Sequence, residues 1–301
     1  MVISASRRTD IPAYYSDWFL KRIQEGFALV RNPMNLRQVS RAPLNRESVD
    51  CLVFWTKNPG NMLPKLNLLD GYPFYFQFTL NSYDKRLEPG VPKKSELIDT
   101  FKRLSDMLGP ERVIWRYDPV ILNNELDTSY HERYFEVLAG KLYQYTSKCI
   151  FSFVDYYKKV EKSFKENGIS ELDAEKKNEI AAKFAAIASR YNLKLETCAE
   201  EIDLSGLGIG HASCIDPLLI EKLSGRQIKA AKDKNQRKAC GCCPSTDIGT
   251  YDTCLHGCAY CYANHNPKSA KLNFMGHDPD SPLLCGKLAD EDKGVLNPYL
   301  R

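Results

Sequence analysis

The sequence predicts an α/β fold whose parallel sheet forms a (β/α) barrel or a partial barrel of about six strands, similar to a TIM barrel. A cysteine-rich segment follows it. Three observations lead to this prediction. Short β-rich apolar runs alternate with amphipathic helical patterns through the first two thirds of the 301 residues. The runs are apolar on both faces, as in a parallel sheet covered by helices. Each run ends in polar residues.

Six apolar runs are predicted to be strands because they are short and rich in β-branched and aromatic residues. They cover residues 2–6, 51–55, 74–78, 113–116, 149–154 and 193–197. Amphipathic patterns lie between them. Residues 95–108 place Leu97, Phe101 and Leu104 on one helical face, before a Gly-Pro stop. Residues 174–191 place Ile180, Phe184 and Ile187 on another.

Two further signals lie beyond the sixth strand. The glycine-rich residues 205–210 lack the G-x-G-x-x-G spacing, so a tight loop is expected there in place of a phosphate cradle. Asp216 and Pro217 form an N-cap followed by a first-turn proline, which predicts a helix ending near Gly225.

Polar residues at all six strand ends favour a barrel over an open doubly wound sheet. A (β/α) barrel builds its active site at the carboxyl ends of its strands, whereas a doubly wound sheet concentrates polar residues near one switch point. The candidate catalytic residues at this mouth are Arg7, Arg8, Asp10, Lys57, Arg116, Asp118, Glu196 and Glu200, with Asp155 and Glu201 beside them. The basic members suit a carboxylate or phosphate, and the acidic ones suit an ammonium, ribose hydroxyls or acid-base work. A rim of ion pairs is the alternative.

Two regions are predicted: a barrel-like domain over residues 1–225, and a cysteine-rich region over residues 226–301 that packs on the barrel mouth. No apolar run reaches the length of a membrane span, and no signal-peptide pattern opens the chain, so a cytoplasmic protein without a membrane partner is expected. Seven of the eleven cysteines lie between Cys240 and Cys285. Clustered thiols in a reducing compartment indicate metal.

Three cysteines, Cys254, Cys258 and Cys261, have C-x3-C-x2-C spacing. Three thiolates from one short loop can hold three irons of a 4Fe-4S cluster and leave the fourth iron open. Cys240 and Cys242 just upstream are further candidate ligands, for the same cluster or for a second one. Structural zinc, completed by such residues as Cys243, His256 or His265, and a redox disulfide are the alternatives.

The spacing, with an aromatic residue before the last cysteine, resembles the cluster loop of the radical S-adenosyl-L-methionine (SAM) superfamily. The resemblance implies that SAM chelates the open iron and is cleaved by one electron to a 5′-deoxyadenosyl radical. It implies that Tyr260 lies against the adenine, with Tyr262 and Asn264 as further cofactor contacts. A flavodoxin or a ferredoxin-like protein would be the electron donor. Residues 257–263 resemble photoproduct-lyase-like members.

Across the whole chain, distinctive segments resemble an uncharacterised bacterial domain-of-unknown-function family, family 1848. They are residues 4–12, 54–59, 115–119, 198–201 and 240–264. Two features depart from the usual radical SAM pattern. The cysteine loop follows the sixth predicted strand, not the first, and no Gly-Gly-Glu element follows the second. Function depends on the assembled site and not on chain order.

The sequence therefore predicts an iron-sulfur enzyme of the radical SAM type whose substrate, a small molecule or a nucleic acid, is not identified. The basic stretch from Arg226 to Lys238 favours nucleic acid weakly, because such runs are often solvated helix faces. One alternative is a nucleic-acid-binding or scaffold protein with structural zinc or a closed cluster. Another is a metal-dependent hydrolase, which the scarcity of histidines at ligand spacing disfavours.

Overall fold

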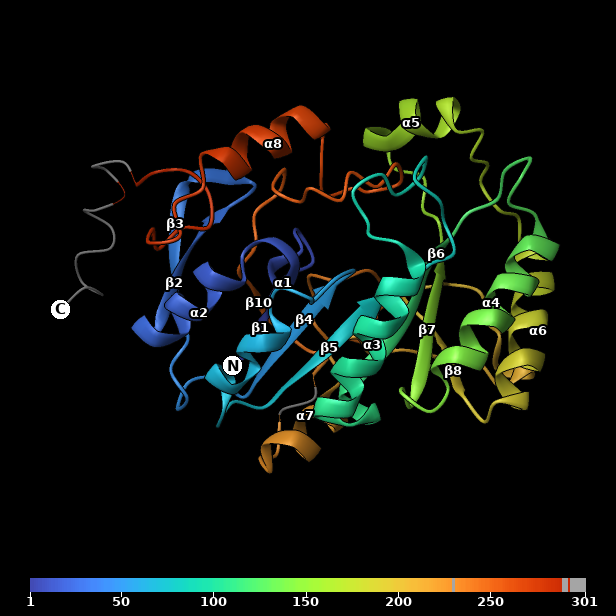
Figure 1. Cartoon of the computed structure of the whole chain (residues 1–301), viewed down its shortest axis with the longest axis horizontal. Coiled ribbons are helices and arrows are strands. Elements are labelled where there is room, and N and C mark those ends of the chain that lie inside the picture. The colour runs from blue at the N-terminus through green and yellow to red at the C-terminus, as the bar shows by residue number, and fades with distance from the viewer. Residues whose placement is uncertain (229–230, 289–291, 293–301) are drawn as a thin grey trace.

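An eight-stranded sheet forms the centre of the computed structural model, which describes residues 1–228, 231–288 and 292 (Figure 1). All seven strand pairings in it are parallel. The strands are β1 (Val2–Ser4), β4 (Cys51–Thr56), β5 (Phe74–Thr79), β6 (Val113–Val120), β7 (Lys148–Phe153), β8 (Lys194–Thr197), β9 (Gly210–His211) and β10 (Thr246–Asp247). Their order in space is β10-β1-β4-β5-β6-β7-β8-β9.

The six strands predicted from the sequence are confirmed, and two short strands extend the sheet at its edges. From β1 to β9 the spatial order follows the chain order without reversal, so the sheet has no switch point of the doubly wound kind. The last strand, β10, pairs with the first, through Ile3 with Thr246 and Ser4 with Asp247. In the described part of the chain β9 and β10 are the two edges, and closure into a barrel stays a prediction.

Helices follow most of the strands. They are α1 (Ile11–Tyr14), α2 (Ser16–Glu25), α3 (Lys94–Leu108), α4 (Thr128–Leu142), α5 (Glu161–Glu166), α6 (Ala174–Arg190), α7 (Pro217–Ser224) and α8 (Pro267–Met275), with 3-10 turns at Leu63–Leu69, Pro110–Arg112, Lys158–Val160 and Ser205–Leu207. The three predicted helices are confirmed as α3, α6 and α7, and the glycine-rich segment is a 3-10 turn followed by β9. Among the described helices, none combines the length and apolar character needed to cross a bilayer.

The two faces of the sheet have different cover. Leu97 of α3, Phe135 of α4 and Phe184 of α6 pack in one cluster with alternate strand residues such as Phe76 and Trp115. The opposite face, called here the inner face, carries the other alternate residues of the strands. It is covered by α7 and by the segment that holds Cys240 and the two cysteines after it. The crossover helices α3, α4 and α6 thus share one face, as in a (β/α) barrel.

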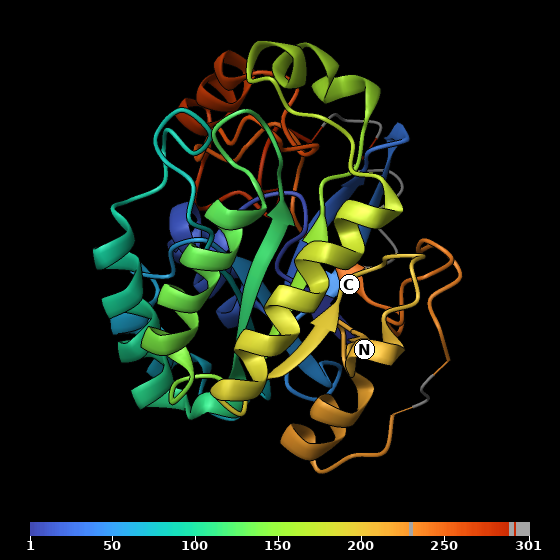
Figure 2. The ribbon, with the colours of Figure 1, turned by 90° about the vertical axis from the view of Figure 1, so that its right-hand side faces the viewer.

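The ends of the sheet also differ. Helices α5 and α8 lie at the end toward which the strands point, whereas α7 lies at the other end (Figures 1 and 2). A second, antiparallel sheet consists of β2 (Phe27–Asn32) and β3 (Asn35–Pro43). This hairpin was not predicted. Most of β3 is exposed, so its sequence lacks the apolar run that marked the central strands.

The aromatic packing between α4 and α6 predicts that truncation of Phe184 destabilises the fold strongly. Its ring is fully buried and stacks on Phe135 with 4.1 Å between ring centroids. Phe184→Ala is expected to lower the free energy of unfolding by about 3–5 kcal/mol, because a cavity replaces the ring. Urea denaturation measures it. Leu218→Ala, at a side chain 75% exposed, is the control and should cost less than about 0.5 kcal/mol.

Candidate functional site

The cysteine loop, defined here as residues 254–264, follows β10 and lies at the carboxyl end of the sheet. Backbone contacts hold it against the connection after β5. The amide of Ala259 donates to the carbonyl of Leu87 at 2.9 Å, and the amide of Gly90 donates to the carbonyl of His256 at 2.8 Å. A Cβ on Gly90 would lie 2.4 Å from the carbonyl oxygen of Leu255. Glycine is therefore required at this crossing.

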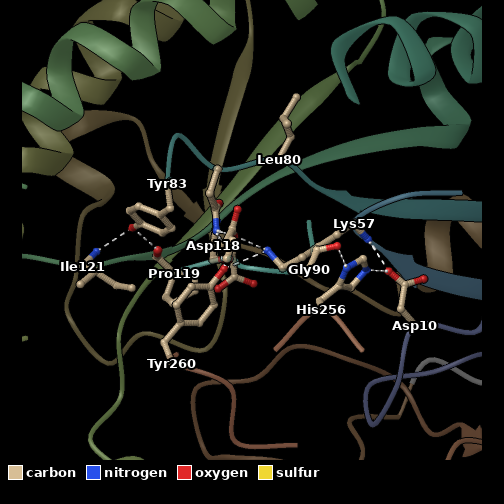
Figure 3. Close-up of polar contacts among 12 residues, drawn as sticks. Asp10, Lys57, Leu80, Tyr83, Gly90, Asp118, Pro119, Ile121, His256 and Tyr260 are labelled. Atoms are coloured by element: carbon tan, nitrogen blue, oxygen red, sulfur yellow. Dashed lines mark hydrogen bonds and ion pairs between the residues drawn. The ribbon is translucent and has the colours of Figure 1, made fainter. Parts of the chain in front are cut away.

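The carboxylate of Asp10 joins three parts of the chain (Figure 3). It accepts the amide of Ala13, capping α1, at 3.0 Å, and the amide of Lys57, after β4, at 2.7 Å. Its Oδ2 lies 2.8 Å from Nε2 of His256, which is 3% exposed. A carboxylate accepts only, so Nε2 of His256 donates to it, and Nδ1 lies 3.0 Å from the Tyr14 hydroxyl. Asp10 is thus fully engaged in fixing the cysteine loop.

A second network is built around Glu88, which is 1% exposed. Lys57 Nζ lies 2.8 Å from Glu88 Oε1 and donates to the Tyr260 hydroxyl at 2.9 Å. Lys94 and the Tyr260 hydroxyl also donate to Glu88. Burial by itself would raise the pKa of Glu88, but Lys57 and Lys94 outweigh it and lower the pKa to about 2. The network fixes the residue that precedes the third loop cysteine.

The pair Arg116 and Asp118 occupies the end of β6. Arg116 Nε donates to Asp118 Oδ2 at 3.0 Å, and the Ser152 hydroxyl donates to Oδ1. Burial would raise the pKa of Asp118, but Arg116 and Ser152 outweigh burial and lower it. Asn81 accepts the amide of Asp118 at 2.8 Å and donates to the Tyr260 hydroxyl at 3.1 Å. Asn81 thus links Asp118 to the Glu88 network, and Arg116 is joined to it through Asp118.

Arg7 and Arg8 follow β1 and lie beside the end of β10. Asp247, at the end of β10, accepts the amide of Arg7 at 2.8 Å and hydrogen bonds from the hydroxyls of Ser4 and Ser6. Arg8 Nε lies 4.0 Å from Asp247 Oδ1. The Arg7 guanidinium stacks 5.0 Å from the ring centroid of Trp55, and its Nη2 is buried without a hydrogen-bond partner among the described residues. Arg7 is therefore available to a further group.

The predicted acidic residues at the end of β8 lie apart from this site. Glu196 pairs with Lys148 at 3.0 Å and with Lys194, the first residues of β7 and β8. Glu200 accepts the amide of Phe153 at 2.8 Å. Burial raises the pKa of Glu200. The two other acidic residues predicted at strand ends are peripheral. Asp155 pairs with Arg237 of the basic stretch, and Glu201 is exposed. Lys229 of that stretch lies outside the described residues.

The three loop cysteines are close enough to affect one another's ionisation. Burial, then Asp10, then Cys261 and Cys258 raise the pKa of Cys254. Burial also raises the pKa of Cys258, to about 12, against the opposing charge of Lys57. Among the described residues, no group of three or more His, Cys, Asp or Glu side chains is preassembled to hold a metal ion. The structure places Cys240 and Cys242 elsewhere, on the inner face beside Cys214.

The predicted cofactor contacts differ in what surrounds them. The Tyr260 hydroxyl is bound within the Glu88 network, and its ring meets Tyr83 edge-on with centroids 5.8 Å apart. Tyr262 is 42% exposed and donates to the carbonyl of Arg7 at 3.2 Å. Asn264 donates to the carbonyl of Cys254 at 2.6 Å, while its Oδ1 is buried without a hydrogen-bond partner in the described part of the chain. Tyr262 and Asn264 are thus the two that retain capacity for a ligand.

A pocket of about 590 Å³ opens beside the loop contact at Leu87. Its walls come from the connections after β5 and β6, from the first half of α4 and from the end of α5, and most of the residues that line it are polar. They include Ser82, Asp84, Arg86, Asn123, Glu125, Tyr130 and Glu166. No residue of the cysteine loop lines it. This pocket and the thiols are therefore adjacent regions of the same end of the sheet, not one cavity.

The residues that sequence reasoning missed are those that connect the strand ends to the loop. Glu88 and Asp247 lie outside the predicted strands, and Tyr14 lies in a one-turn helix. Each contributes through partners more than 150 residues away in the chain. The sequence signal that could have indicated the role of Asp247 is the glycine two residues after it, Gly249. A Cβ on Gly249 would lie 2.0 Å from the Ser6 hydroxyl oxygen, so that glycine marks a close crossing of β1 and β10.

Comparison with known proteins confirms the resemblance to family 1848. A family model described as "Domain of unknown function (DUF1848)" matches residues 2–263. That span covers all eight strands of the central sheet and the three loop cysteines. No curated protein matches the chain, and no solved structure does.

The role of Asp10 predicts a coupled effect on stability and loop order. Asp10→Asn replaces one acceptor oxygen with an amide facing N–H donors, so the free energy of unfolding should fall by about 1–3 kcal/mol. Urea denaturation measures this. Amide hydrogen exchange should accelerate at residues 253–260. Asp17→Asn, at a carboxylate 76% exposed, is the control. Equal effects of the two substitutions would contradict the assignment.

The Glu88 network predicts acid-dependent stability. Because the folded pKa of Glu88 is lowered to about 2, its contribution is present above the unfolded pKa of about 4.3 and is lost as pH falls toward 2. Between pH 6 and pH 2.5 the difference in the free energy of unfolding between the natural protein and Glu88→Gln should shrink by roughly 2 kcal/mol. Urea denaturation at a series of pH values from about 6 to about 2.5 tests it.

Glu132→Gln provides the matched control, because Glu132 pairs with Lys183 at the surface with 42% of its side chain exposed. Loss of such a pair should change the free energy of unfolding by less than about 1 kcal/mol. A difference between the natural protein and Glu88→Gln that stays constant with pH would show that Glu88 is not held ionised by the two lysines.

Proposed function

We propose that this chain, which belongs to the DUF1848 family, is an iron-sulfur enzyme of the radical SAM type. The observation that carries the proposal is the position of the cysteine loop. The loop follows β10, and β10 is the first strand in the spatial order of the sheet. In the radical SAM resemblance, the cluster loop follows the first barrel strand. The two arrangements agree in space although they differ in chain order.

The residues present fit a cluster in three respects. Cys254, Cys258 and Cys261 come from one short loop and lie near one another. Lys57 places a positive charge near Cys258, which favours its thiolate. The raised pKa values of the thiols mean that metal binding would release protons. These three cysteines would hold a 4Fe-4S cluster, with SAM on the remaining iron supplying a 5′-deoxyadenosyl radical on reduction by a flavodoxin or ferredoxin-like donor.

The protein's own groups would bind and orient SAM and substrate. Arg7 and Arg8 follow β1, the second strand in space, where radical SAM proteins carry Gly-Gly-Glu. They suit a carboxylate better than an ammonium. The unpartnered Oδ1 of Asn264 can accept an N–H. The Glu88 and Asp10 networks keep the loop in place, because each fixes one side of Cys258 through Tyr260 or His256.

The polar pocket at Ser82, Arg86 and Glu125 is the proposed substrate entrance. Its mixture of amide, hydroxyl and charged groups suits a small polar molecule. Arg237 of the basic stretch is engaged by Asp155, which reduces the positive charge available to a nucleic acid. A partial barrel, with residues 226–301 acting as the cluster-bearing region over its mouth, completes the proposal.

Anaerobic purification and reconstitution with iron and sulfide test the function. The full chain should take up a cluster whose reduced electron paramagnetic resonance spectrum changes when SAM is added, and it should release 5′-deoxyadenosine under reduction. Cys258→Ala should abolish both the spectral change and the product. Cys285→Ala, at a half-buried cysteine outside the matched family region, is the control and should behave like the natural protein.

Zinc without iron in oxygen-free material would instead favour the alternative of a binding or scaffold protein with structural zinc. A cluster that ignores SAM would favour a closed iron-sulfur site. Either result would overturn the enzymatic proposal.

A further inference from the structure

Four other cysteines meet on the inner face of the sheet, and they are named here the inner cysteines: Cys198, Cys214, Cys240 and Cys242. The sulfurs of Cys198 and Cys214 are 3.3 Å apart. Cys214 also contacts Cys242, and Cys242 contacts Cys240, through their side chains. Cys214, Cys240 and Cys242 are each less than 9% exposed. Three separate segments of the chain thus bring four thiols into one continuous group.

The backbone around these thiols is tightly fixed. The carbonyl of Cys214 accepts from the Tyr75 hydroxyl at 2.6 Å and from Gln77 Nε2 at 2.9 Å, which anchors it over β5. A Cβ on Gly241 would lie 2.6 Å from the Ser213 hydroxyl oxygen. The chain between Cys240 and Cys242 thus passes close to the residue before Cys214, and a side chain at position 241 would have to displace the Ser213 hydroxyl. The convergence of the thiols is therefore built into the backbone.

Donors and cations surround the sulfurs. Arg116 Nη1 donates to the Cys214 sulfur at 2.9 Å, and the amide of Ile215 donates to the Cys242 sulfur at 3.3 Å. Arg7, whose buried Nη2 has no hydrogen-bond partner in the described residues, lies close enough to Cys242 and Cys214 to interact with their charges. Thiolates need such N–H donors and positive charges when they are buried. Buried neutral thiols packed as small apolar residues need none of them.

We propose that the inner cysteines form a tetrathiolate site for one thiophilic metal ion of the zinc type, separate from the cysteine loop. A tetrahedral ion with metal–sulfur bonds of about 2.3 Å has sulfurs about 3.8 Å apart. The distance of 3.3 Å between Cys198 and Cys214 is near that edge. The four sulfurs form a chain of contacts, not a finished tetrahedron. The χ1 angle of each cysteine sets the direction of its sulfur. Rotation about χ1 would therefore bring the four sulfurs into tetrahedral positions around the ion without movement of the backbone.

The charge of the site fits its surroundings. A divalent ion with four thiolates carries a net charge of about −2, and the guanidinium groups of Arg7 and Arg116 face the thiols. Such an ion would tie the segment after β8, the segment after β9 and the segment before β10 together across the inner face. It would also fix both arginines beneath the mouth. Its role is structural, and it does not depend on the function proposed for Cys254, Cys258 and Cys261.

The test uses a full-length variant without the loop thiols, with Cys254, Cys258 and Cys261 all changed to Ser. After purification with Zn²⁺ it should retain about one zinc per chain, measured by elemental analysis. Replacement by Co²⁺ should give the visible ligand-field bands of a tetrahedral cobalt thiolate. Adding Cys214→Ser and Cys242→Ser should remove both signals, whereas adding Cys285→Ser should remove neither.

Loss of metal could also follow from misfolding of the multiple variants, so a second measurement uses the natural chain. Zn²⁺ should protect all four inner cysteines from alkylation, read residue by residue by mass spectrometry, and a chelator should reverse the protection. Absence of metal from the loop-deficient variant, unprotected inner cysteines, or a Cys198–Cys214 disulfide in place of bound metal would overturn the proposal. Iron with sulfide bound to the inner cysteines would overturn the single-ion site.

Discussion

The arrangement of the carboxyl end of the sheet depends on the carboxylate of Asp10. Through its two oxygens it binds the first turn of α1, the backbone after β4 and the imidazole of His256. Of these partners, Lys57 is 47 residues from Asp10 in the chain, and His256 is 246 residues from it. A buried carboxylate is costly unless its lone pairs are satisfied, and here every donor that satisfies them belongs to a different part of the site. The hydrogen bonds that satisfy the buried Asp10 carboxylate are therefore the same ones that hold the cysteine loop in position.

The Glu88 network also satisfies a buried carboxylate beside the loop, but two of its donors are charged lysines. Lys57 and Lys94 offset the burial of one carboxylate, and Tyr260 shares it. Buried ion pairs add little net stability compared with apolar packing, but removing one partner is expensive. Such a network suits a loop that has to stay in one place. Lys57 joins the two networks, because its backbone amide binds Asp10 and its ammonium binds Glu88.

Periodicity and composition were sufficient for the central strands and for α3, α6 and α7, because apolar faces and helix caps are local signals. The predicted positions of Arg7, Asp10, Lys57, Arg116 and Asp118 near one another follow from the parallel sheet. Glu196 lies elsewhere because its lysine partners start β7 and β8. The two-residue strands β9 and β10, the role of Glu88 and the grouping of Cys240 with Cys214 could not be predicted, since they arise from contacts between segments far apart in the chain.

The pairing of β10 with β1 has a consequence for how the protein folds. Strand β1 is made first, yet one of its edges stays open until residues 246–247 arrive. That pairing spans most of the chain. Contacts of such long range form slowly, because the entropy cost of closing the intervening loop comes before the contacts stabilise the sheet. During synthesis the unprotected edge is open to pairing with other chains. Placement of the cysteine loop is therefore a late folding event, because the sheet edge that precedes it is complete only after residues 246–247 have been synthesised.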